Sequence, residues 1–184
     1  MITSICATLL LLCSIFKTTF DFEYSNKDEF VRGITNCTVQ FNSVIPPQHR
    51  SIVVISVAQA ILESNWGESR FATLGNNFYG MIQTDETEPH IKALGGNILL
   101  KKYGRKCESV ADYINLLNAG TDFVEYRKVR GKETVLQEVD LDELINTLHT
   151  FAIDKEYTTK IKKTVDYLLR EYPEIFLIAR GQNV

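Results

Sequence analysis

The sequence predicts a mainly α-helical domain that carries one small β-hairpin lobe, and three observations support this. The stretch "SIVVISVAQAIL" (51–62) is apolar nearly all the way round and too long for a typical strand, as in a helix buried at the centre of a domain. Segments 109–118, 122–129, 141–151 and 154–172 have helical periodicity. Residues 80–103 lack it and place Gly95-Gly96 between two strand-like pieces, which predicts the hairpin lobe.

The helix boundaries follow from capping residues. A serine followed by two acidic residues (25–29) predicts the start of a first helix. Pro46-Pro47 suits the first turn of the central helix, which we expect to run to about Trp66 and to stop at Gly67. After the lobe, Ser109 is the expected cap of the next helix.

Composition indicates one ordinary globular domain. The chain has 184 residues, of which 45% are apolar and 23% are charged, and its formal net charge is −3. This charge gives no reason to expect nucleic-acid binding. No repeat or flexible linker interrupts residues 25–172, so we predict a single domain over 25–184 that acts as a monomer.

The N-terminal stretch "MITSICATLLLLCSIF" (1–16) is an apolar run of signal-peptide length. No Lys or Arg precedes it and no clear cleavage site follows it, so residues 1–24 are either a signal peptide or an uncleaved anchor that associates with the membrane. Either reading predicts an exported protein in the periplasm, in the cell envelope or outside the cell. Cys37 and Cys107 remain after this segment, as one disulfide or as two separate buried thiols.

A carboxylate at the end of so apolar a helix needs an explanation. Gln59, Glu63 and Trp66 are spaced to share one helical face, which lines either a cleft or a buried polar network. Burial raises the pKa of a carboxyl, and a carboxyl that stays protonated near neutral pH can act as a general acid on a glycosidic oxygen. The structural alternative is that Glu63 pairs with Arg70 or accepts hydrogen bonds from loop N–H groups.

The residues that follow Glu63 favour the catalytic interpretation. They comprise a Trp-Gly-x-Ser element (66–69) and then paired asparagines, an aromatic pair and a glycine (76–80). This pattern resembles the signature of the glucosaminidase domain of glycoside hydrolase family 73. The resemblance continues at 108–117 and 151–161 and covers about 53–169, and the stretch 117–130 is closest to the Bax-like and flagellar branch of that family.

The resemblance implies a lysozyme-like fold and an endo-β-N-acetylglucosaminidase that cleaves β-1,4 bonds in the glycan strands of peptidoglycan. Glu63 would be the catalytic acid, and Tyr157 would be a second catalytic residue that helps to position the substrate. The implied substrate-binding residues are Gln59, Trp66, Asn76, Asn77, Phe78 and Tyr113. The structural alternatives are core packing for Trp66, a left-handed turn for Asn76-Asn77, and an ordinary helix position for Tyr157.

The family also implies an acidic residue on the lobe. The stretch "QTDETEPH" (83–90) offers Asp85, Glu86 and Glu88, and spacing does not decide among them. We assign the role to Glu88, and the alternative is a solvent-exposed acidic loop. Glu68, five residues from Glu63, is expected to point away from the cleft.

Two other functions compete with this assignment. The element "GMIQ" (80–83) is similar to one in lytic transglycosylases, which favours a transglycosylase or muramidase of the same fold. A non-catalytic wall-binding protein on the same scaffold is the second alternative. The three histidines, His49, His90 and His149, are scattered without ligand spacing, so we expect no metal site, no cofactor and no amidase activity.

Overall fold

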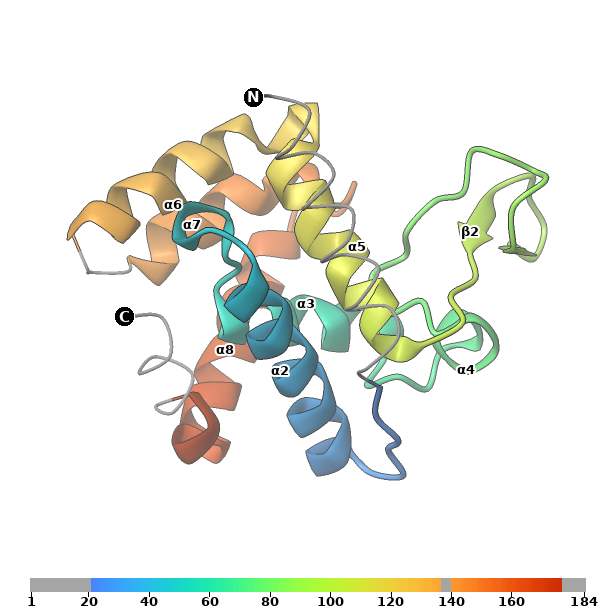
Figure 1. Cartoon of the computed structure of the whole chain (residues 1–184), viewed down its shortest axis with the longest axis horizontal. Helices are drawn as coiled ribbons and strands as arrows, with labels where there is room; N and C mark the ends of the chain where they lie inside the picture. Colours follow the sequence, from blue (N-terminus) through green and yellow to red (C-terminus); the bar gives the residue numbers. More distant parts are fainter. Residues whose placement is uncertain (1–20, 137–139, 177–184) are drawn as a thin grey trace.

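The computed structural model describes residues 21–136 and 140–176 (Figure 1). Its helices are α2 (Lys27–Val44), α3 (Val53–Ser64), α4 (Arg70–Gly75), α5 (Lys106–Ala119), α6 (Val124–Leu136), α7 (Leu141–Asn146) and α8 (Tyr157–Glu171). Short 3₁₀ turns are η1 (Pro47–His49), η2 (Thr121–Phe123) and η3 (Thr147–Thr150), and the strands are β1 (His90–Lys92) and β2 (Leu99–Lys101). The mainly α-helical domain with a hairpin between residues 80 and 103 is confirmed.

Helix α3 is the centre of the body and packs against α2 and α8 (Figure 1). Ten of its side chains are buried: Val53, Val54, Ile55, Ser56, Val57, Ala58, Gln59, Ala60, Ile61 and Ser64. Only Leu62 and Glu63 are partly exposed. The prediction of a helix buried on nearly every side is therefore confirmed.

The predicted start of this helix is wrong. Pro47 begins η1 instead, and Arg50 is extended, so α3 starts only at Val53. The reason lies in α2, where the Asn42 amide donates to the Ser51 carbonyl (2.8 Å) and accepts from the Ser51 N–H (2.9 Å). These bonds hold the chain extended between the proline turn and the helix.

The first turn of α5 also differs from the prediction. Ser109 lies inside α5, where its buried hydroxyl accepts a hydrogen bond from the Phe78 N–H (3.0 Å). The exposed N–H groups at the helix start bond to carboxylates instead. Glu108 accepts from the N–H groups of Gly104 and Arg105, and Asp21 accepts from that of Lys106 (2.9 Å). Acidic groups suit this end of a helix dipole.

A disulfide joins the two cysteines that follow the N-terminal stretch. Cys37 of α2 and Cys107 of α5 are bonded, with their Cα atoms 5.3 Å apart. Both side chains are buried. Of the two alternatives that the sequence leaves open for this pair, the structure has the disulfide.

The hairpin lobe lies with α4 on one side of the body, away from α6 (Figure 1). Strands β1 and β2 are antiparallel and pair His90 with Lys101, Ile91 with Leu100 and Lys92 with Leu99. Ile91 and Leu100 are buried, and their neighbours on each strand are more exposed. Leu100 also forms a bridge with Ile82, so the chain after α4 runs along the outer edge of β2.

The first described residues, 21–24, pack onto the body. Phe22 fills the space beside Gly33 of α2, where a side-chain carbon would lie only 2.0 Å from its ring. The Tyr24 hydroxyl donates to the Gly67 carbonyl (2.7 Å), just beyond α3. Residues 21–24 therefore pack on the body, and the domain boundary predicted after residue 24 stays a prediction.

The predicted signal peptide or anchor, apart from residues 21–24, lies outside the described residues. Within the ranges 21–136 and 140–176, no helix has the length and apolar character needed to cross a membrane.

Candidate active site

Glu63 is held in the last turn of α3 by an abrupt end to the helix. Asn65, Trp66 and Gly67 take left-handed backbone conformations one after another, with φ of 50°, 59° and 80°. Ser64 accepts from the Gly67 N–H (2.8 Å) and donates to the Ala60 carbonyl (2.5 Å), which fixes this reversal. The carboxyl of Glu63 therefore stands at a rigid helix end, partly buried.

The surroundings of Glu63 favour its protonated form. Burial raises the pKa of Glu63, and a hydrogen bond with Tyr157 of α8 acts in the opposite direction with a smaller effect. Gly80 also lies close to the carboxyl of Glu63, because a side-chain carbon at residue 80 would be 3.8 Å from the Glu63 Oε2. Gly80 itself is exposed and has φ +66°, so the carboxyl lies beside bare backbone at the protein surface.

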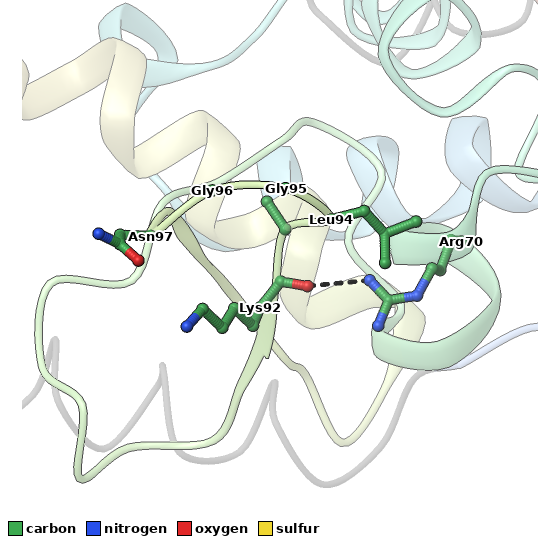
Figure 2. A pocket seen from close by; sticks show the side chains of 7 residues that line it. Arg70, Lys92, Leu94, Gly95, Gly96 and Asn97 are labelled. Carbon is green, nitrogen blue, oxygen red and sulfur yellow. Dashed lines mark hydrogen bonds between the residues drawn. The ribbon is translucent and has the colours of Figure 1, made fainter.

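One structural alternative for Glu63 was an ion pair with Arg70, and this prediction is wrong. The Arg70 guanidinium donates to the Lys92 carbonyl of β1 (2.9 Å). Arg70 and residues 92–97 line a shallow hollow at the tip of the hairpin, and none of the predicted site residues lines this hollow (Figure 2). Glu68 is exposed and accepts from the Asn65 amide (3.4 Å).

Tyr157 meets Glu63 from within the core, and Gln59 bonds to Tyr157 on its inner side. The Gln59 amide donates to the Tyr157 hydroxyl (2.9 Å), and the Tyr113 hydroxyl donates to the Gln59 carbonyl oxygen. Gln59 and Tyr113 are 0% exposed and Tyr157 is 4% exposed. Burial raises the pKa of Tyr157 strongly, and the Glu63 charge adds to this effect, so its hydroxyl stays protonated.

The loop that carries Gly80 is fixed by the paired asparagines. Asn76 ends α4 in a left-handed conformation (φ 51°), as predicted for this turn, and its amide donates to the Tyr103 carbonyl (3.0 Å). Asn77 donates to the carbonyls of Met81 (2.9 Å) and Lys101 (3.0 Å) and accepts from the Met81 N–H (3.0 Å). Asn77 therefore ties the Gly80 loop to β2.

Four of the predicted substrate-binding residues are buried, and direct contact of these residues with a substrate stays a prediction. The Phe78 ring packs in a cluster with Phe22, Tyr24 and Phe30, with ring centroids 5.5–6.1 Å from its own. The exposed fraction is 0% or 1% for each of the four: Gln59, Asn77, Phe78 and Tyr113. The sequence pattern placed these residues near the site, but it did not show which of them are accessible to solvent. Helical and motif spacing carry no information on how deeply a side chain is buried.

Trp66 does not share the helical face of Gln59 and Glu63. It lies beyond the end of α3, so the predicted spacing over seven helical residues does not apply to it. Its ring packs edge-to-face on Tyr167 of α8, with centroids 6.0 Å apart, and the Lys27 ammonium lies 4.7 Å from its centroid. These contacts support the core-packing alternative, and substrate contact by Trp66 stays a prediction.

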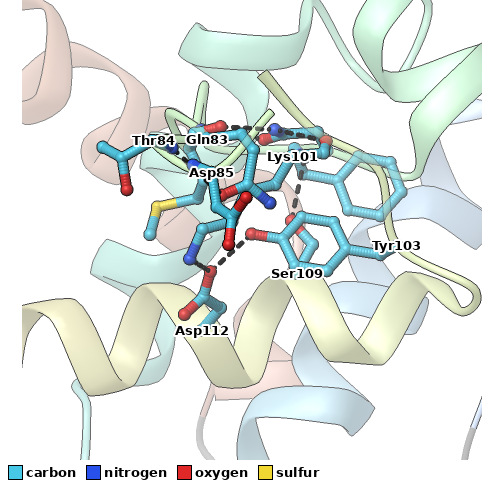
Figure 3. Close-up of polar contacts among 10 residues, drawn as sticks. Gln83, Thr84, Asp85, Lys101, Tyr103, Ser109 and Asp112 are labelled. Atoms are coloured by element: carbon cyan, nitrogen blue, oxygen red, sulfur yellow. Dashed lines mark hydrogen bonds and ion pairs between the residues drawn. The ribbon is translucent and has the colours of Figure 1, made fainter. Parts of the chain in front are cut away.

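The lobe acids are exposed and held only by local turns. Asp85 accepts from the N–H (2.9 Å) and hydroxyl (2.6 Å) of Thr87, which lowers its pKa. Glu86 and Glu88 are also exposed. The loop starts at Gln83, whose side chain accepts from the N–H groups of Thr84 and Asp85 (Figure 3). The predicted role of Glu88 stays a prediction.

The base of the lobe, in contrast, is anchored to α5. The Lys101 ammonium (2.7 Å) and the Tyr103 hydroxyl (2.6 Å) both donate to the same carboxylate oxygen of Asp112 (Figure 3). All three side chains are partly buried. Sequence reasoning missed this anchor and the position of Gly80. Gly80 is part of the signature, but only the fold brings its backbone to Glu63.

Comparison with known proteins identifies the family. A family model described as "Glucosaminidase: Mannosyl-glycoprotein endo-beta-N-acetylglucosaminidase" matches residues 48–169. The exo-glucosaminidase LytG of Bacillus subtilis (strain 168) is 34% identical over 134 residues, which cover 66% of this chain and 46% of LytG. The chain thus spans about half the length of this curated relative.

Solved structures support the fold. The glycoside hydrolase domain of FlgJ from Salmonella typhimurium has a TM-score of 0.59 at 18% identity, covering 87% of this chain and 100% of that one. The catalytic domain of the autolysin Auto from Listeria monocytogenes has a TM-score of 0.59 at 19% identity, covering 79% and 87%. The lysozyme-like fold expected from the resemblance is therefore confirmed.

Proposed function

Since the chain belongs to the glucosaminidase family, we propose that it hydrolyses the β-1,4 bond after N-acetylglucosamine in peptidoglycan glycan strands. The observation that carries this proposal is the carboxyl of Glu63, which combines partial burial, a raised pKa and a place beside the exposed backbone of Gly80. A protonated carboxyl at the surface is what cleavage of a glycosidic bond requires.

In the proposed first step, Glu63 transfers its proton to the glycosidic oxygen while the bond from that oxygen to the sugar C1 breaks. Glu63 then carries a negative charge, and the hydrogen bond with Tyr157 favours this charged form. The positive charge that develops on the sugar needs a partner, either a lobe carboxylate or the substrate's own N-acetyl oxygen. Water then attacks C1 and gives up a proton, which restores the acid.

The lobe acid that fits this second role best is Glu88. Asp85 already accepts two hydrogen bonds from Thr87. The side chains of Glu86 and Glu88 are therefore freer to approach a substrate. Glu88 is exposed at the end of the loop, next to β1. Such a side chain can approach a bound sugar but is not held in place beforehand, so we propose a supporting role for Glu88 rather than an equal one.

Mass spectrometry of digested peptidoglycan tests the reaction. Fragments with reducing-end N-acetylglucosamine are expected from the wild-type protein and not from Glu63→Gln. Reducing N-acetylmuramic acid would identify a muramidase, anhydromuramic ends a transglycosylase, and free stem peptides an amidase. Each of these three results would overturn the proposed bond. Fragment length over time separates an endo from an exo mode, the mode named for LytG.

We further propose that the protein is exported and acts as a monomer. The Cys37–Cys107 disulfide supports export, because such bonds persist in oxidising compartments. Thiol alkylation of the protein from its native cells, without prior reduction, should leave both cysteines unmodified. Gel filtration should give the mass of one chain. Labelled cysteines, or a dimer mass, would contradict the respective proposal.

A further inference from the structure

A continuous series of buried hydrogen bonds leads from the core to Glu63. The Tyr113 hydroxyl donates to the Gln59 carbonyl oxygen. The Gln59 amide nitrogen donates to the Tyr157 hydroxyl (2.9 Å), and Tyr157 is hydrogen-bonded to Glu63. The series therefore connects α3, α5 and α8 to the carboxyl at the end of α3.

The hydrogen bonds in this series all run in one direction, from Tyr113 toward Glu63. Tyr113 has a single proton, and that proton goes to the Gln59 carbonyl oxygen. The Gln59 nitrogen, which can only donate, then faces the Tyr157 oxygen. The Tyr157 hydroxyl therefore donates its own proton to a hydrogen bond with Glu63.

We propose that Gln59 is a positioning residue that fixes the direction of the Tyr157 hydroxyl, so that Tyr157 donates to Glu63 and never accepts from it. The consequence concerns the protonated acid. If Tyr157 accepted from Glu63, the catalytic proton would be held inside the protein. With Gln59 in place, the Glu63 proton remains directed at the glycosidic oxygen. This inference rests on the proposed function, because it assumes that Glu63 is the acid.

Burial supports a positioning role over a substrate-contact role. Gln59 and Tyr113 are 0% exposed, so neither side chain reaches a substrate without rearrangement of the core. The Tyr113 ring is also stacked on Tyr79, with centroids 4.0 Å apart and planes within 8°. Packing therefore holds the donor of the Gln59 oxygen in place, and Gln59 has little freedom to turn its amide over.

The predicted signature of this role is a shift in pH dependence. The titratable groups of the site are Glu63, Tyr157 and Tyr113, and two further tyrosines act on them: Tyr79 on both Tyr157 and Tyr113, and Tyr126 on Tyr113. The bond from Tyr157 lowers the pKa of Glu63, so its loss raises that pKa. Activity requires protonated Glu63 and disappears as the pH rises through this pKa. The alkaline limb of kcat/KM therefore moves to higher pH when Gln59 no longer directs Tyr157.

Two variants and one matched control test the proposal on digested peptidoglycan. Gln59→Leu removes both hydrogen bonds of the amide. Tyr113→Phe removes only the donor to the Gln59 oxygen and so allows the amide to turn over. Tyr172→Phe is the control: it also removes one tyrosine hydroxyl, and that hydroxyl donates to Asp28 (2.6 Å), outside the series.

For Gln59→Leu we expect kcat to fall about tenfold to hundredfold, less than the 10²–10⁴-fold of a direct acid–base group, with KM nearly unchanged. Tyr113→Phe should lower kcat about tenfold, and both variants should shift the alkaline limb upward. Tyr172→Phe should leave kcat and the alkaline limb in place. If Gln59→Leu does not fold, as judged by its melting temperature, Tyr113→Phe decides alone.

Two failures are distinguishable. If wild type and Glu63→Gln release the same products, the proposed function fails and the inference falls with it. If Glu63→Gln is inactive, but Tyr113→Phe has the kcat and alkaline limb of Tyr172→Phe, only the positioning role of Gln59 is overturned.

Discussion

The two sides of the candidate site are built differently. On the helical side, Glu63 is held at a rigid helix end and connected to Tyr157, Gln59 and Tyr113 through buried side chains. On the lobe side, the acids of residues 85–88 are exposed, and Asp85 is held only by its neighbour Thr87. The helical side has its geometry before substrate arrives, and we propose that the lobe side acquires its geometry on binding.

This difference indicates where catalysis depends on folding. Groups that are fixed in advance need no reorganisation when the reaction proceeds, so they carry the larger share of the rate. An exposed acid loses side-chain freedom when it engages the substrate, and this cost reduces its effect. The base of the lobe is firmly attached through Asp112, so the freedom is confined to the acidic loop.

The largest expected effect is that of Glu63→Gln. The variant keeps the shape of the side chain but has no proton to give, so turnover on peptidoglycan should fall by at least about 10⁴-fold, the upper end for one acid–base group. The measurement is release of reducing ends. A folded Gln variant with near-wild-type activity would rule out Glu63 as the acid and, with it, the importance of the helical side.

Tyr157→Phe should have the next largest effect. It removes the hydroxyl that bonds to Glu63 and leaves the Gln59 amide nitrogen without its acceptor. We expect kcat to fall about 10²–10³-fold, within the range for groups that take part in proton transfer. Tyr172→Phe, which removes a hydroxyl that donates to Asp28 (2.6 Å), is the matched control. Equal rates for the two variants would contradict the role of Tyr157.

Glu88→Gln tests the lobe side. We expect a decrease in kcat of about 10²-fold, the lower end for one acid–base contribution, because the side chain is not held in place beforehand. Glu86→Gln and Asp85→Asn provide matched removals of charge in the same loop and should change kcat by less than this. A decrease in kcat as large as that of Glu63→Gln would contradict the expected difference between the helical side and the lobe side.

The helical side also depends on the segment 21–24. A chain that begins at Ser25 lacks the Asp21 contact with the start of α5, the Phe22 ring beside Gly33, and the Tyr24 bond to Gly67. We expect it to be less stable than a chain that begins at Asp21 by about 3 kcal/mol, from lost apolar burial and hydrogen bonds. At about 2–4 °C per kcal/mol, its melting temperature should fall by about 6–12 °C. Equal melting temperatures of the two chains would contradict a stabilising role of residues 21–24.

The smallest effect concerns the stability of the Glu63 site itself. Because the pKa of Glu63 is raised on folding, the unfolded chain loses this proton first as the pH rises from the ordinary value of 4.5. The free energy of unfolding is therefore lowered above the raised pKa and is unaffected well below 4.5. Glu63→Gln should melt a few degrees higher than wild type near neutral pH, and this difference should vanish in acid. Melting curves of both proteins across the pH range provide the measurement, and a constant difference at all pH values would contradict burial as its cause.

The sequence predicted the fold class and the position of Glu63, because both depend on local pattern. The apolar run of 53–62 is too long for a typical strand, and Pro89 with Gly95-Gly96 interrupts helical periodicity. It did not predict where α3 begins, because that depends on the bonds between Asn42 and Ser51. It also did not predict that Asn77 and Phe78 are buried, because the signature fixes residue order and not depth.

What the sequence determined by itself is therefore the set of helices, the hairpin and a carboxylate at the end of an apolar helix. Only the tertiary structure decided what surrounds that carboxylate. Gln59 and Tyr157 are 98 residues apart, and Gln59 and Tyr113 are 54 residues apart, yet one amide joins them. Helical periodicity relates residues a few positions apart along the chain, whereas contacts between α3, α5 and α8 depend on how whole helices pack.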